Sequence, residues 1–107
     1  MLLSTFERLL TLSVLPKEGD LTTIRIVRDL KSALSFTEAE HDVLKFTQDP
    51  TTRATHWVNQ VDPIEIPVGP KALDVIVGGF EALNKAKKLT TEHLPVYERF
   101  LEIQATN

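Results

Sequence analysis

Cysteine is absent from this chain of 107 residues, and the other residues that build specialised sites are few. Without cysteine there is no disulfide framework, no zinc knuckle and no thiol nucleophile, and the composition suits a reducing compartment such as the cytoplasm. The chain has four glycines, and its one adjacent pair, Gly78-Gly79, lacks the Lys-Ser/Thr of a phosphate-binding loop. The sequence therefore argues against a disulfide scaffold, a zinc knuckle, thiol catalysis and a nucleotide-binding loop at these glycines.

Long apolar runs are also missing. A membrane-spanning helix needs about 20 consecutive apolar residues, whereas the longest apolar window, 73–80, contains Asp74 and two glycines. Glu7 and Arg8 interrupt the apolar start of the chain too early for a secretory signal. The net charge of −3 gives no overall attraction to nucleic acid and is too small for a nucleic-acid mimic. We therefore predict no membrane partner, and we disfavour nucleic acid.

Patterns typical of catalysis and metal binding are scarce. His41, His56 and His93 stand far apart in the sequence, and none belongs to a metal-binding motif. The acidic residues of 38–42 are explained by their place at the start of a helix, where they complement its dipole. There is no nucleophile elbow and no Ser-His-Asp arrangement. We predict a protein that is not an enzyme, with no catalytic residue, cofactor or metal.

What the chain does have is a series of signals for helix starts. Ser4 with Glu7 and Thr37 with Glu40 form capping boxes, and Pro70 fits the first turn of a helix after Gly69. The expected helices span about 5–13, 21–34, 38–46, 70–87 and 92–104. Their apolar residues recur at three- and four-residue steps, which is typical of helices with one buried face. The expected inward residues are Phe6, Leu9, Leu10 and Val14; Leu21, Ile24, Val27, Leu30 and Leu34; Ala39, Val43, Leu44 and Phe46; Leu73, Ile76, Val77, Phe80 and Leu83; and Leu94, Tyr97, Phe100 and Leu101.

The middle of the chain changes to a period of two. Alternating side chains predict strands at about 53–58 and 64–68, joined by residues 59–62 as a central antiparallel hairpin. A lone hairpin is only marginally stable, so we expect Trp57 to pack it against the helices. The prediction is a single domain over 1–107, of the α+β class but mostly helical, ending in a helical hairpin.

Candidate partner-binding residues come from two arguments. Arg25, Arg28 and Lys31 fall on the solvent side of the helix at 21–34; a solvated face is the simpler interpretation, and a binding face is the alternative. Trp57, Tyr97 and Arg99 belong to the residue types that dominate interface hot spots, although core positions suit Trp57 and Tyr97 better. Glycines inside a helix, as at 78–79, further suggest close approach by another element or subunit.

Three short helices followed by a hairpin also match the order of a winged helix-turn-helix. In that arrangement the helix at 38–46 would read DNA. Its outward residues include Glu38, Glu40 and Asp42, and only Lys45 is basic. Carboxylates in contact with DNA would repel its phosphates, because they lie within a Debye length of about 8–10 Å. DNA reading by this helix is therefore disfavoured.

Several strings in the chain resemble a family of small proteins of tailed phages and prophages that has no established activity. They are LPKEG at 15–19, TTIRIVRDL at 22–30, LSFTE at 34–38, THW at 55–57, ALNK at 82–85, LTTEHL at 89–94 and YERF at 97–100. The resemblance covers most of the chain, but these strings encode mainly helix caps and core positions. The family has no established catalytic residues, so none is carried over.

The resemblance implies a non-enzymatic accessory protein that binds a protein partner, of the host or the phage, stoichiometrically in the host cytoplasm. Inhibition of a host defence complex or host enzyme is one form of that function. The alternatives left open are a DNA-binding regulator of the winged-helix type and a virion or tail-assembly component. Self-association is also left open.

Overall fold

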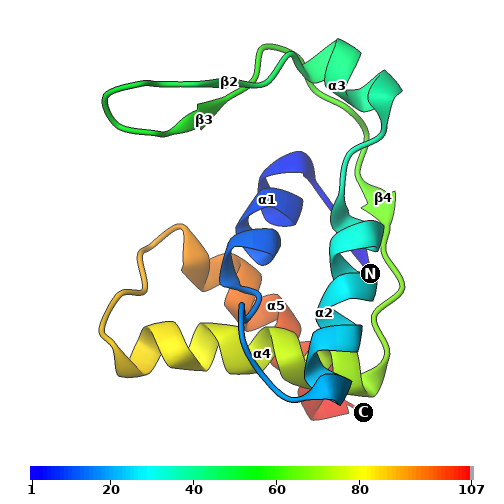
Figure 1. The fold of residues 1–107 in the computed structure, drawn as a ribbon, viewed down its shortest axis with the longest axis vertical. Helices are drawn as coiled ribbons and strands as arrows, with labels where there is room; N and C mark the ends of the chain where they lie inside the picture. Colours follow the sequence, from blue (N-terminus) through cyan, green and yellow to red (C-terminus); the bar gives the residue numbers. More distant parts are fainter. Residues whose placement is uncertain (107) are drawn as a thin grey trace.

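The computed structural model describes residues 1–106, which form a body of packed helices and a projecting hairpin (Figure 1). The helices are α1 (Thr5–Val14), α2 (Leu21–Leu34), α3 (Glu38–Leu44), α4 (Pro70–Lys85) and α5 (His93–Thr106). The strands are β1 (Leu2–Leu3), β2 (Thr47–Gln48), β3 (Thr55–His56) and β4 (Ile64–Glu65). The predicted class, α+β with mostly helical content, is confirmed, and α3 and α4 end two residues earlier than expected.

The predicted helix starts are confirmed at the level of individual hydrogen bonds. The Ser4 hydroxyl accepts from the Glu7 N–H at 3.2 Å, while a Glu7 carboxylate oxygen accepts from the Ser4 N–H at 3.0 Å. Thr37 and Glu40 exchange the same pair of bonds at the start of α3. These reciprocal bonds satisfy backbone donors that the first turn of a helix leaves unpaired. The caps therefore fix where α1 and α3 begin.

The body is built from four of the helices. α4 and α5 pack as the predicted C-terminal helical hairpin, α1 and α2 both pack on α4, and α1 also contacts α2. At the centre lies Phe80, whose ring stacks on Tyr97 with centroids 4.9 Å apart and lies 6.1 Å from Phe100. The buried core also contains Leu3, Val14, Leu15, Val27, Leu30, Leu34, Ile66, Leu73, Ile76, Val77 and Val96.

The predicted hairpin between 53–58 and 64–68 is wrong. β3 pairs instead with β2, with Thr47 opposite His56, and β4 pairs with β1, with Leu3 opposite Ile64. The β2–β3 turn is closed by Asp49, whose carboxylate accepts from the Thr51 N–H at 2.8 Å. Asp49 thus closes a tight turn that pairs β3 with the segment after α3, and the start of the chain supplies the partner of β4.

The predicted inward faces hold only in part. In α1 the buried residues are Thr5, Arg8, Thr11 and Val14, whereas Phe6 is exposed. Leu21 and Ile24 in α2, Val43 in α3, and Leu94 and Leu101 in α5 are exposed as well. The apolar residues of these helices span a wider arc than the neighbouring helices cover, so only part of each arc is buried.

α3 and the β2–β3 hairpin lie apart from the α4–α5 pair, as Figure 1 shows. Within residues 1–106, the closely packed helix pairs are those of the body, and α3 belongs to none of them. The order of elements matches a winged helix-turn-helix, but α3 does not join α1 and α2 in a three-helix bundle. None of the described helices combines the length and apolar character that crossing a membrane requires.

Candidate functional site

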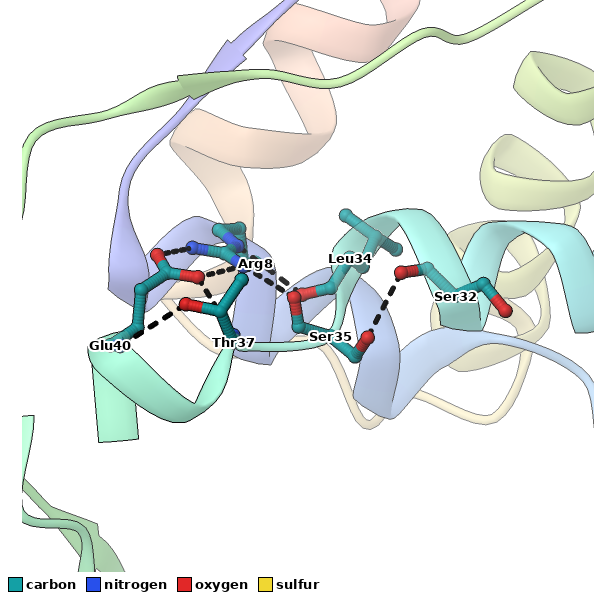
Figure 2. Close-up of polar contacts among 6 residues, drawn as sticks. All are labelled: Arg8, Ser32, Leu34, Ser35, Thr37 and Glu40. Carbon is teal, nitrogen blue, oxygen red and sulfur yellow. Dashed lines mark hydrogen bonds and ion pairs between the residues drawn. The ribbon is translucent and has the colours of Figure 1, made fainter. Parts of the chain in front are cut away.

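The most concentrated polar cluster surrounds Arg8, a side chain only 1% exposed. Figure 2 shows its guanidinium pointing at Glu40 of α3 and at the backbone at the end of α2. Nη1 and Nη2 donate to the Glu40 carboxylate at 2.6 and 3.2 Å, Nη2 also donates to the carbonyl of Ser35 at 2.6 Å, and Nε donates to that of Leu34 at 3.2 Å. The Phe36 ring covers the guanidinium, whose Cζ atom lies 3.9 Å from the ring centroid.

The bonds of Arg8 are directed within the protein rather than towards a ligand. It neutralises Glu40 and caps the last carbonyls of α2, groups that a helix end leaves without partners. The hydrogen bonds from Arg8 hold the pKa of Glu40 below its ordinary value of 4.5, outweighing the opposing effect of burial. We therefore assign this cluster to the joining of α1, α2 and α3.

Three of the predicted partner-binding residues lie in three different places. Tyr97 is only 9% exposed and stacks on Phe80, so the structure places it in the core. Trp57 is half-buried, with its ring 6.1 Å from that of Phe46 at the base of the hairpin. Trp57 therefore packs against Phe46, which follows α3. It also lines a groove together with Phe6 of α1.

Arg99 links α5 to the N-terminal segment and is not a free surface cation. It forms an ion pair with Glu7 and donates to the carbonyl of Leu2 at 2.8 Å, which joins α5 to the start of the chain. Burial favours a raised pKa for Glu7, but hydrogen bonds from Ser4 and Arg99 outweigh it and leave that pKa below 4.5. We therefore separate Tyr97, Trp57 and Arg99 from the candidate interface.

The other three predicted residues share one face of α2. Arg25, Arg28 and Lys31 are all exposed, and Arg28 and Lys31 line a hollow of about 380 Å³. Lys17, from the segment between α1 and α2, lines the same hollow, so that three cations surround it. The remaining lining residues are Pro16, Ile24, Val27 and Ser32. We call Lys17, Leu21, Ile24, Arg25, Arg28 and Lys31 the α2 face.

Apolar side chains on the α2 face lie among these cations. Ile24 is 37% exposed and Leu21 is 66% exposed, although both were expected to be buried. Positions 21, 24, 28 and 31 fall on one side of a helix, and Arg25 adjoins them. Asp29 pairs with Arg28 at 3.2 Å, but both side chains are largely exposed, so that pair contributes little. Two further acids, Glu18 and Asp20, adjoin Lys17 and Leu21 in the sequence. The face is therefore apolar in its middle and cationic around it.

Lys17 is the residue of this face that sequence reasoning missed. It lies in the segment after α1, outside any periodic pattern, and only the fold brings it beside α2. The sequence contained a signal for the apolar part, because Leu21 and Ile24 lie at the edge of the arc whose middle holds Val27 and Leu30. A wide arc shows which residues are apolar but not which of them the neighbouring helix covers.

Over residues 1–106, no group of three or more histidine or acidic side chains gathers closely enough to hold a metal ion. Comparisons with known families, with curated proteins and with solved structures find no match for this chain.

Proposed function

We propose that this protein binds a protein partner stoichiometrically through the α2 face, without catalysis. The observation that carries the proposal is the hollow beside α2, in which Ile24 is exposed between Lys17, Arg28 and Lys31. Interfaces commonly have an apolar centre with a charged or polar rim, and arginine is enriched at their hot spots. The α2 face has this composition on a surface that the chain itself leaves exposed.

The charges of the face indicate the chemistry of the partner. The three cations that line the hollow, together with Arg25 beside them, outnumber the neighbouring acids Glu18, Asp20 and Asp29, so the face fits a surface that presents carboxylates around an apolar side chain. Opposite charges across an interface speed association and exclude partners of like charge. The partner is therefore an acidic protein surface with an apolar residue that enters the hollow.

The resemblance of the sequence to tailed-phage proteins is our reason for proposing an infected bacterial cell as the setting of this binding. A small accessory protein there acts by covering a surface, and a host enzyme or defence complex is the class of target we propose. A stable interface needs about 800 Å² on each side, which a long helix with its adjoining loop supplies in large part.

The test is affinity capture from bacterial lysate with the tagged protein, a face variant and a matched control. The face variant is Arg28→Glu/Lys31→Glu; the control, Lys45→Glu/Lys71→Glu, makes the same charge change at exposed positions of other segments. The captured protein is identified by mass spectrometry, purified, and titrated against each variant by calorimetry. We expect near-equimolar binding that the face variant weakens at least tenfold and the control leaves nearly unchanged.

Other outcomes overturn the proposal in distinct ways. A partner that binds all three proteins equally assigns recognition to another surface. Recovery of nucleic acid, with affinity that falls steeply with salt, favours the DNA-binding regulator. Recovery of the protein itself or of virion components favours the assembly role.

A further inference from the structure

The turn that leads into α5 is held by two hydrogen bonds between the same pair of residues. The His93 N–H donates to the Thr90 carbonyl at 3.1 Å, and the Thr90 N–H donates to Nδ1 of the His93 ring at 2.9 Å. The Thr90 hydroxyl also lies 2.9 Å from Nδ1. Because an imidazole nitrogen accepts a hydrogen bond only when it carries no proton, this geometry requires a neutral ring with its proton on Nε2.

This turn is a variant of the capping boxes that begin α1 and α3. In those boxes the N–H of the cap residue donates to the side chain three positions later, which is Glu7 or Glu40. In the turn before α5, the same spacing places a histidine in the acceptor position. A carboxylate remains an acceptor in mild acid, whereas histidine changes its charge between about pH 5 and 8. The start of α5 therefore depends on an acceptor that mild acid removes.

The surroundings of the half-buried His93 ring supply no fixed counter-charge. The ring lies edge-to-face with Phe80 of α4, with centroids 6.2 Å apart. Within residues 1–106, no ion pair joins His93 to an acidic side chain. The exposed acids nearby are screened by solvent, so a proton on His93 gains little from them. The charged residues of the elements that meet here are Glu81, Lys85, Lys87 and Lys88 from α4 and the turn after it, Glu92 and Glu98 from the α5 side, and Arg99, which pairs with Glu7 of α1.

We propose that the turn 90–93 is a pH-sensitive switch at the start of α5, closed when His93 is neutral and open when it is protonated. A proton on Nδ1 removes the acceptor of the Thr90 N–H and reverses the contact with the Thr90 hydroxyl, which then accepts from Nδ1. The Thr90 N–H is left to water, and the positive ring meets the positive end of the helix dipole. Mild acid therefore loosens the turn and the start of α5.

The switch reaches the surface of the molecule through Glu92, which lies inside the turn. Glu92 lines the groove that Phe6 of α1 and Trp57 after β3 also line. When the turn opens, this wall of the groove moves, so the shape of the groove depends on pH. The carboxylates of Glu7 and Glu40 respond at lower pH, because hydrogen bonds hold the pKa of each below 4.5.

The first test is an NMR titration of the purified full chain between about pH 8 and 5, the range in which histidine changes charge. At the upper end we expect the neutral His93 ring to carry its proton on Nε2, which long-range nitrogen–proton spectra report. On acidification, the Thr90 amide signal should shift with the midpoint of the His93 ring. This shift should persist in His56→Gln, at an exposed position of the hairpin, and disappear in His93→Gln.

A second variant restores the capping box of the other helices. In His93→Glu a carboxylate takes the acceptor position, so the opening should move to the range below about pH 5, where carboxylates are protonated. Between about pH 8 and 5.5, the melting temperature of the wild type should fall relative to this variant by about 4 °C, the effect of losing one helix-capping bond in a domain of this size. His56→Gln is the matched control and should follow the wild type.

Three results would overturn the proposal. They are a neutral His93 ring with its proton on Nδ1, a Thr90 amide signal that does not follow the titration of His93, and melting temperatures of the wild type and His93→Glu that fall in parallel. The first two are measured on the wild type and do not depend on the folding of a variant. Circular dichroism checks that each variant is folded. None of these results bears on the α2 face, which is tested separately.

Discussion

At the scale of single residues, Arg8 is stabilised in the interior by the oxygen atoms around it. Both carboxylate oxygens of Glu40 and the carbonyls of Leu34 and Ser35 accept its hydrogen bonds. A buried charge is tolerated only when it is paired and hydrogen-bonded in this way. The stability of the fold therefore depends on the acceptors around Arg8, and Glu40 is the only one of them that supplies a negative charge.

We predict that Glu40→Gln lowers the free energy of unfolding by about 1–3 kcal/mol at neutral pH. Glutamine keeps the shape and one acceptor oxygen, but it leaves the buried Arg8 without a counter-charge. Urea unfolding followed by circular dichroism measures the loss. Glu38→Gln, at an exposed position in the first turn of the same helix, is the control and should change stability by no more than a few tenths of a kcal/mol.

The same variant predicts a change in acid stability. The pKa of Glu40 is lowered in the folded state, chiefly by its hydrogen bonds with Arg8, so its charged form stabilises the fold above the unfolded value near 4.5. That contribution is lost as the pH falls through the lowered folded-state pKa. Unfolding free energies measured from pH 7 down to acid should therefore fall less steeply in Glu40→Gln than in the wild type. Equal slopes would show that Glu40 does not carry this dependence.

The role of Arg8 could not be predicted from the sequence. Its partner Glu40 lies 32 positions away, and Phe6 and Leu9 around it predict a different buried face for α1. The capping boxes were predictable because a hydroxyl and a glutamate three residues apart interact within one turn of helix. Long-range pairing of this kind depends on the tertiary fold and leaves no local spacing to detect.

At the scale of elements, the adjacent glycines of α4 give opposite predictions for the same substitution. Gly78→Ala should raise the free energy of unfolding by about 0.5–1 kcal/mol, because alanine favours the helix and its Cβ has open space. Gly79→Ala should lower it by more than that, because the new Cβ overlaps the Val14 carbonyl and forces α1 away from α4. Thermal and urea unfolding at low protein concentration measure both variants. Equal effects at the two positions would contradict this packing.

The sheet pairing shows where element-level prediction stops. Alternation located β3 and β4 correctly, since both lie within the expected strand segments. Their partners were missed because β4 pairs with β1 near the start of the chain, and β3 pairs back across the turn that follows Asp49. Period-two patterns show that a segment is extended, but they do not identify the neighbour that supplies its hydrogen bonds.

At the scale of the whole molecule, the candidate site combines a predictable part with an unpredictable one. The stripe of Arg25, Arg28 and Lys31 follows from helical spacing alone, and the structure places it on the exposed side of α2. Lys17 and the exposure of Ile24 depend on how the segment after α1 turns back beside α2. Side-chain periodicity can therefore locate a charged face, while the hollow within it arises only from the packing of two separate segments.

The β2–β3 hairpin projects from the molecule and contributes no residue to the buried core of the body (Figure 1). Thr47 and His56 lie opposite each other at its base, so residues 48–55 can be replaced by Asn-Gly, the dipeptide favoured in two-residue turns. The replacement removes Ala54 and Thr55, which line a hollow with Phe6, but it keeps Phe46, Trp57 and every residue of the buried core. We therefore expect the melting temperature to fall by less than about 4–8 °C, the shift that 1 kcal/mol produces in a domain of this size. Calorimetry of the shortened variant beside the wild type measures this.

Shortening the hairpin also tests whether partner binding depends on the α2 face or on the hairpin. If α2 carries partner binding, the shortened variant should bind the captured partner with an unchanged dissociation constant, while Arg28→Glu/Lys31→Glu binds it at least tenfold more weakly. The reverse pattern would assign binding to the hairpin. A large drop in melting temperature would instead show that β2 and β3 support the body, which the separation of the hairpin from the buried core argues against.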